Sequence, residues 1–339
     1  MRMVLRTLFG VGVAALAIGC GNDDSPAATG GRGGAAGSSG SGGTQSGGSA
    51  GTSGGAAGSG AGGAAGDAGV PCSEPASEIP PGSVCIHDVR GRMVDESGVP
   101  IPSLLATVCG AICFYGETQP SGNFTVSVNS HVPLADYSVL PHARPERAGF
   151  YFRLPVDAPG PMIDMGDLPV PMMPADGPVL VVKTDNAGAP AQTVTSGDVT
   201  LDVQAGIQME LDVDEVAKRE LGQKFRTLSI PASSRSAFID SALGAVALYA
   251  LAPFDASFRR VSDDTAVGAR FSFKNNTGLI ANTAVEVLAL GSYLDPAWVR
   301  PGTFEPVATA RVSADGSKID LDAGQGIKRL TWVGLRQKR

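Results

Sequence analysis

The residues of this chain that could do chemistry are few, and cysteine is the most informative type among them. The 339-residue sequence has five cysteines and three histidines. One cysteine, Cys20, directly follows an apolar N-terminal segment, and the other four lie within residues 72–113. An even number of closely spaced cysteines in an exported protein indicates disulfides. The four cysteines expected to form two bridges are Cys72, Cys85, Cys109 and Cys113.

Counting alone leaves three pairings of these cysteines open. A bridge between Cys109 and Cys113 would close a short loop between two predicted strands. A bridge between Cys72 and Cys85 would fasten the end of the N-terminal tract to the first predicted strand. This is the pairing that we predict.

A zinc site is not expected, because the cysteines and histidines lack the spacing that such sites use. There is no C-x-x-C pair, and His87, His131 and His142 form no H-x-H or H-E-x-x-H unit. All three histidines fall near polar or Pro-flanked segments without a partner nearby in the sequence. We interpret them as isolated surface residues.

Aspartates in predicted turns raise calcium as an alternative, because this ion is bound by several carboxylate oxygens. None of these runs has the D-x-[DN]-x-[DN]-G spacing of a calcium loop. We interpret them as solvated turns, and we predict that the chain takes no metal and no cofactor. The aspartates concerned are Asp212, Asp214, Asp315, Asp320 and Asp322.

Two catalytic patterns occur, and both fall in a tract of Gly, Ser and Ala. Residues 47–51 match G-x-S-x-G, and residues 58–63 match G-x-G-x-x-G. Each pattern works only at a strand-to-helix turn, which neither stretch is expected to form. Both are therefore artefacts of composition, and we predict no catalytic residue and no enzyme.

Four aromatic residues are candidates for stacking on a sugar ring. They are Phe114, Tyr115, Tyr293 and Trp298. A buried or loop-anchoring role is the commoner alternative for such side chains.

The N-terminal segment predicts export and membrane anchoring. Residues 1–19 combine Arg2 and Arg6 with an apolar run, as secretory signal peptides do. A spanning helix needs about 20 apolar residues, and this run is too short for one. The stretch L-A-I-G-C, which ends at Cys20, resembles the lipobox of bacterial lipoproteins, although Ala17 stands where Leu is usual. The resemblance implies that Cys20 becomes the lipid-bearing N-terminus, in the cell envelope and specifically the outer membrane.

Residues 20–70 predict a disordered tether behind the lipid. From residue 21 to residue 70, 42 of 50 positions are Gly, Ala, Ser or Thr, and none is aromatic. Such a tract cannot bury enough apolar surface to offset its chain entropy. As a flexible coil it would average about 40 Å end to end, from about 5–6 Å times the square root of its length.

The remaining chain predicts an all-β fold of two antiparallel β-sandwich domains, over residues 71–171 and 172–339. The Pro-rich stretch 155–178 denies donors to any strand ladder, and we place the domain boundary within it. Residues 212–223 have helical spacing and predict one short helix. The predicted strands are 84–94, 104–109, 113–118, 124–128, 137–140, 149–154, 179–183, 199–203, 246–251, 271–273, 285–290, 307–312, 319–321 and 327–335.

The first of these domains resembles the carboxypeptidase regulatory-like domain. The resemblance rests on G-R-M-V-D-E-S-G-V-P-I-P from Gly91 and on T-Q-P-S-G-N-F-T-V from Thr118. The sequence departs from the family's pattern at Ser103, Leu104 and Gln119. The resemblance implies a seven-stranded prealbumin-like sandwich without catalytic residues, in which the motif glycines serve turns and close packing.

The end of the chain carries a second resemblance. V-S-A-D-G-S-K-I from Val312 and G-I-K-R-L-T-W-V-G-L-R from Gly326 are similar to the C-terminal module of uncharacterised lipoproteins from predatory soil bacteria. That module has no known activity.

The charge of the chain limits which classes of partner it can bind. The chain carries 26 Lys and Arg against 33 Asp and Glu, a net charge of −7, and has no basic run. Phosphate binding needs a basic patch, so nucleic acid is not an expected partner. We predict a membrane-anchored, non-catalytic interaction or structural module whose partner is an envelope protein or a glycan. The alternatives are a carbohydrate- or peptidoglycan-binding lipoprotein and a hydrolase with an unrecognised site.

Overall fold

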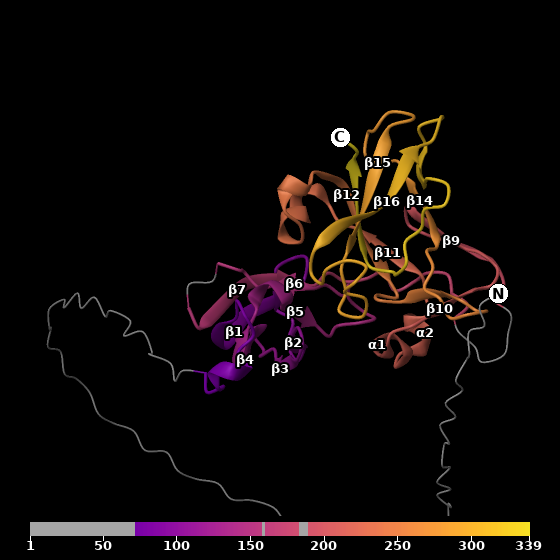
Figure 1. The fold of residues 1–339 in the computed structure, drawn as a ribbon. Helices are drawn as coiled ribbons and strands as arrows, with labels where there is room; N and C mark the ends of the chain where they lie inside the picture. The colour runs from indigo at the N-terminus through magenta and orange to yellow at the C-terminus, as the bar shows by residue number, and fades with distance from the viewer. Residues whose placement is uncertain (1–71, 158–159, 183–188) are drawn as a thin grey trace, which may run out of the picture. The chain divides into compact units, whose positions relative to one another are not determined.

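The structure, a computed structural model, describes residues 72–339 except 158–159 and 183–188 (Figure 1). Cys20, the predicted signal peptide and the predicted tether therefore lie outside the described residues. The described part is mostly β, as the sequence predicts. None of its helices is long and apolar enough to cross a membrane. We call residues 72–339 the head; they belong to one compact unit by their internal contacts.

The first part of the head is a pair of small sheets. One has the order β4-β1-β7 and the other the order β3-β2-β5-β6. Side chains from both sheets, such as Val89 and Val108, share one core. The strands are β1 (Val84–Val94), β2 (Leu105–Cys109), β3 (Cys113–Glu117), β4 (Asn123–Val132), β5 (Ser138–Pro141), β6 (Phe152–Arg153) and β7 (Met162–Pro169). Short 3-10 turns are η1 (Ala76–Glu78) and η2 (Leu134–Asp136).

Strand β4 follows from its period-two pattern. Phe124, Val126 and Val128 are buried, while the polar residues between them are exposed. Alternate side chains of a strand point to opposite faces, so one face enters the core. Gly91 is required here because a Cβ atom would lie 2.8 Å from the Phe124 ring. Gly122 has φ of +78°, which a turn glycine adopts without strain.

Strand β7 corrects the prediction that the Pro-rich stretch forms no ladder. It lies inside that stretch and pairs with β1 in parallel. The prolines at 161 and 169 fall before the strand and at its last residue, so the residues between them keep their N–H donors. The prediction counted prolines over the whole stretch and so missed the segment between Pro161 and Pro169, which contains none.

The second part is a nine-stranded antiparallel sheet with the order β11-β12-β18-β15-β16-β17-β14-β9-β8. The sheet curls until its two edges approach, where the main-chain N–H of Thr227 on β11 donates to the Ser196 hydroxyl on β8 at 3.1 Å. Its strands are β8 (Gln192–Ser196), β9 (Val199–Val203), β11 (Arg226–Ser229), β12 (Ala245–Ala252), β14 (Arg270–Lys274), β15 (Ala284–Leu290), β16 (Phe304–Val312), β17 (Lys318–Leu321) and β18 (Trp332–Gln337). A separate ribbon pairs β10 (Ile207–Glu210) with β13 (Ser257–Arg260).

Three expectations for this part need correction. The closing strand predicted over 327–335 is β18, Trp332–Gln337, and Ile327 makes only an isolated bridge with Ala269. The helix predicted over 212–223 is two four-residue turns, α1 (Val213–Val216) and α2 (Arg219–Gly222). Residues 179–182 make only isolated bridges, at Val179 and Val182, instead of a strand. The remaining turns are η3 (Ala232–Ala237) and η4 (Ser241–Leu243).

Two cores fill the head. One lies inside the curled sheet and draws only on residues from 180 onward. The other continues from the small sheets into the large one, and it includes Val89, Phe150, Leu248 and Trp332. The two parts of the head therefore share buried side chains.

Candidate functional site

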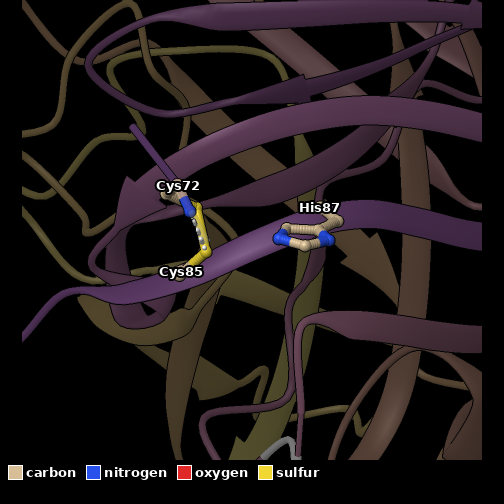
Figure 2. Close-up of side chains that lie close together, drawn as sticks. All are labelled: Cys72, Cys85 and His87. Carbon is tan, nitrogen blue, oxygen red and sulfur yellow. Dashed lines mark hydrogen bonds between the residues drawn. A yellow bond between two sulfur atoms is a disulfide. The ribbon is translucent and has the colours of Figure 1, made fainter. Parts of the chain in front are cut away.

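The chain enters the head through residues 72–74, which we call the entry strap. A disulfide joins Cys72 to Cys85 on β1, and a second joins Cys109 to Cys113 across the β2–β3 hairpin. The predicted pairing is confirmed. The first bridge links Cys72, the first described residue, to β1. Figure 2 shows this bridge with His87 beside it.

Glu74 provides a second attachment for the strap. Its carboxylate accepts hydrogen bonds from the Ser130 hydroxyl, the His131 main-chain N–H at 3.0 Å and the His131 ring. These bonds, led by that from Ser130, lower the pKa of Glu74 to about 2. The strap is thus held to β4 by a group that stays ionised at neutral pH.

Strand register brings further donor groups to the strap. Cys85 and His87 stand two residues apart on β1 (Figure 2), and Cys85 is paired with His131 on β4. The Sγ atoms of Cys72 and Cys85 and a ring nitrogen of His87 all lie within 4.8 Å of one another. The same holds for Cys72, Glu74 and His131. We call these five residues the strap cluster.

The sequence interpretation of His131 and His142 as isolated is wrong. His131 pairs with Glu74 at 3.1 Å, and His142 pairs with Asp214 at 3.2 Å. The local signal for the strap cluster was Cys85-Ile86-His87, because residues i and i+2 share a face of a strand. The contribution of His131 depends on the pairing of β1 with β4, which no local pattern shows.

A second group of ionisable residues surrounds the buried side chain of Arg144. Its guanidinium lies 3.1 Å from Asp212, 3.0 Å from Asp214 and 3.4 Å from Asp255. Tyr151 donates its hydroxyl proton to Asp255 at 2.7 Å. Burial lowers the pKa of Arg144, but Asp255 and the other acids outweigh it and the net shift is upward. We call this group the arginine network.

Glu215 lies beside the arginine network and is fully buried. One carboxylate oxygen accepts the main-chain N–H of Phe254 at 3.0 Å, whereas the other has no partner among the described residues. Burial raises the pKa of Glu215 to about 7, against the opposing effects of that hydrogen bond, Arg144 and Arg226.

The centre of the arginine network is closed to solvent. The Asp255 side chain has no exposed surface, and Tyr151 is only 3% exposed. A cavity of about 230 Å³ lies next to it, lined in part by Asp212, Asp255 and Arg329. Because the charged groups face one another, the arrangement serves to hold segments together.

An apolar groove of about 510 Å³ lies at another place on the head. Asp95 and Glu96 are its charged lining residues, and no Lys or Arg is among the described residues that line it. Hydrogen bonds from the N–H groups of Val99 and Ser97 lower the pKa of Asp95, and Arg147 adds to the shift. The other lining residues are Pro169, Pro171, Met172, Leu228, Ser229, Ile230, Pro231, Ser234, Ala237 and Phe238.

The candidate stacking residues do not share one environment. Phe114 and Tyr293 pack against the shared core, and Trp298 packs against the core of the large sheet. Tyr115 on β3 is 65% exposed.

The aspartates considered for calcium contact protein donors. Asp212 and Asp214 hold Arg144, whereas Asp315 accepts from the Ser317 N–H within its own turn. Asp320 pairs with Lys318, and Asp322 accepts from Thr309.

The comparisons with known proteins add no assignment. No protein-family model matches the chain. No curated protein is significantly similar to it.

The environment of Glu215 predicts a pH-dependent stability. Its pKa is 4.5 when unconstrained and about 7 in the folded chain, so below 4.5 both states hold the proton and no penalty arises. Between pH 4.5 and 7 the unfolded state ionises this carboxyl while the folded state keeps it protonated. The free energy of unfolding therefore falls over this range by on the order of 3 kcal/mol from this residue, and it levels off above pH 7, where both states are ionised. Glu215→Gln should remove that fall.

The measurement is urea unfolding of the wild type and the variant from pH 4.5 to pH 8. The stability difference should grow with pH in favour of Glu215→Gln. The exposed Glu220 on α2 gives a matched control, Glu220→Gln. A Glu215→Gln difference that stays constant with pH would contradict the assignment.

Proposed function

We propose that this chain is a lipid-anchored envelope protein that displays a rigid β head and acts by binding, without catalysing a reaction. The lipobox-like stretch before Cys20 supports the anchor, and the composition of residues 21–70 supports the tether. The entry strap supports the display role. Its disulfide transfers any pull from the tether to the β4-β1-β7 sheet instead of to the free end of β1.

The observation that carries the binding role is the apolar groove. Exposed apolar surface gathered in a concave site is a common basis for recognition. Its floor and walls are largely Pro, Leu, Ile, Met and Phe side chains, and its charged residues are both acidic. The occupant that fits is a peptide segment of another envelope protein with an apolar side chain next to Lys or Arg.

The ionisable groups of the head favour binding over catalysis. A hydrolase needs a nucleophile, a base within reach of it and access for the substrate. The residues of the arginine network are engaged with one another, and Arg144, Tyr151 and Asp255 are buried. The resemblance to the carboxypeptidase regulatory-like domain has the same implication, and the seven strands of β1 to β7 in two sheets are consistent with it.

The groove predicts a defined specificity. Random peptides displayed on phage and selected against the full chain should be enriched for an apolar residue flanked by Lys or Arg. Met172 is 45% exposed in the groove, so Met172→Asp should weaken binding of a selected peptide about tenfold or more, as should Glu96→Lys. Ile280→Asp, at a 79% exposed position outside the groove, should leave binding unchanged.

Other outcomes distinguish the alternatives. Retention of peptidoglycan or a polysaccharide that Tyr115→Ala abolishes, with no peptide enriched, would favour the glycan-binding function. Turnover of a peptidase, esterase or glycosidase substrate that one substitution abolishes would overturn the non-catalytic proposal.

The anchor has its own test. Cys20→Ser should move the protein from the detergent-rich phase to the aqueous phase, or leave it uncleaved, because the acyl chains are lost. Detergent phase partitioning followed by immunoblotting measures this. Equal partitioning of the variant and the wild type would contradict lipidation at Cys20.

A further inference from the structure

We propose that the strap cluster is a redox-dependent zinc site, in which zinc replaces the Cys72–Cys85 disulfide as the attachment of the tether. The ligands are the thiolates of Cys72 and Cys85 and a ring nitrogen each of His87 and His131. Glu74 orients His131 as its hydrogen-bonded carboxylate. This site is independent of the apolar groove.

The donor set suits zinc in type and in geometry. Structural zinc sites take four Cys and His ligands in a tetrahedron. Ligand atoms about 2.0–2.3 Å from one zinc ion lie about 3.3–3.8 Å apart. The Cys72, Cys85 and His87 donor atoms already lie within 4.8 Å of one another, and those of Cys72, Glu74 and His131 form a second such group. Cys72 belongs to both groups, so zinc binding requires side-chain rotations that bring His131 together with Cys85 and His87.

Most of the site persists without the disulfide. Cys85, His87 and His131 stand on β1 and β4, whose ladder runs from Val84 to Arg92 with one register shift, between Ile86 and Asp88. The strap is also held by Glu74, through hydrogen bonds to Ser130 and His131. Reduction therefore frees two thiols without releasing the segment that carries Cys72.

The carboxylate of Glu74 gives His131 the environment of a zinc ligand. Ligating histidines usually donate their second ring N–H to a carboxylate, which fixes the orientation of the ring. The Nδ1 atom of His131 lies 3.1 Å from a Glu74 carboxylate oxygen. The other ring nitrogen is then the one that binds the metal.

The redox step requires a dithiol reductant. Thiol–disulfide exchange transfers two electrons and two protons to the sulfurs of Cys72 and Cys85, and the dithiol becomes a disulfide. Zinc binding then releases both thiol protons to solvent and forms two Zn–S bonds. In the oxidised chain the sulfurs are bonded to each other, so no zinc binds.

Cobalt(II) titration of the full chain carrying Cys20→Ser tests the site, after reduction with a phosphine and its removal. One equivalent of cobalt should give the visible bands of a tetrahedral centre and thiolate charge transfer, and zinc should displace it. The unreduced chain should give neither. Zinc should also raise the thermal midpoint of the reduced chain and leave that of the oxidised chain unchanged.

Matched variants identify the ligands. Cys72→Ser/Cys85→Ser should abolish the cobalt spectrum, and His87→Ala or His131→Ala should weaken cobalt binding at least tenfold. Cys109→Ser/Cys113→Ser and His142→Ala, at the second disulfide and the third histidine, should change neither. The proposal is overturned if the reduced chain gives no tetrahedral spectrum. It is also overturned if the spectrum depends on Cys109 and Cys113, or if His87→Ala and His142→Ala behave alike.

Discussion

The packing of Trp332 against residues 149–150 is the interaction on which the rest of the head depends. Trp332 is fully buried on β18, and its indole N–H donates to the Gly149 carbonyl at 2.5 Å. Its ring lies 4.8 Å from that of Phe150 and 4.5 Å from that of Phe238. Such aromatic pairs contribute about 0.5–1.5 kcal/mol each beyond their area of burial. Because Gly149 and Phe150 lie between β5 and β6 of the small sheets and Trp332 belongs to the large one, this packing joins the two.

The arginine network lies along the same junction and adds specificity more than stability. Arg144 comes from the segment before Phe150, whereas Asp214 and Asp255 come from the second part of the head. A buried ion pair gains little net free energy, because desolvation offsets the attraction. Losing one partner costs about 3–5 kcal/mol, because an unpaired charge stays buried. The network therefore permits only the arrangement in which all the charges meet, and Glu215 makes it sensitive to pH.

Local periodicity predicted much of the fold, and non-local pairing accounts for what it missed. Strand β1 was predicted with its observed bounds, because its ends are marked by turn residues. Strand β7 was missed between two prolines, and β8, β10, β11 and β13 were missed as well. The disulfide partners followed from loop length and chain order. The strap cluster could not be predicted in this way. It forms only when β1 and β4 pair in their register and the entry strap lies next to both strands.

The central claim is that the described residues of the head form one cooperative body. Native-state hydrogen exchange of the full chain, followed by mass spectrometry at increasing denaturant, tests it most directly. Peptides from β1 and from β12 should converge on one opening reaction, with the same free energy and the same denaturant dependence. Exchange of β1 through a separate opening, with a lower free energy and a smaller denaturant dependence than that of β12, would contradict it.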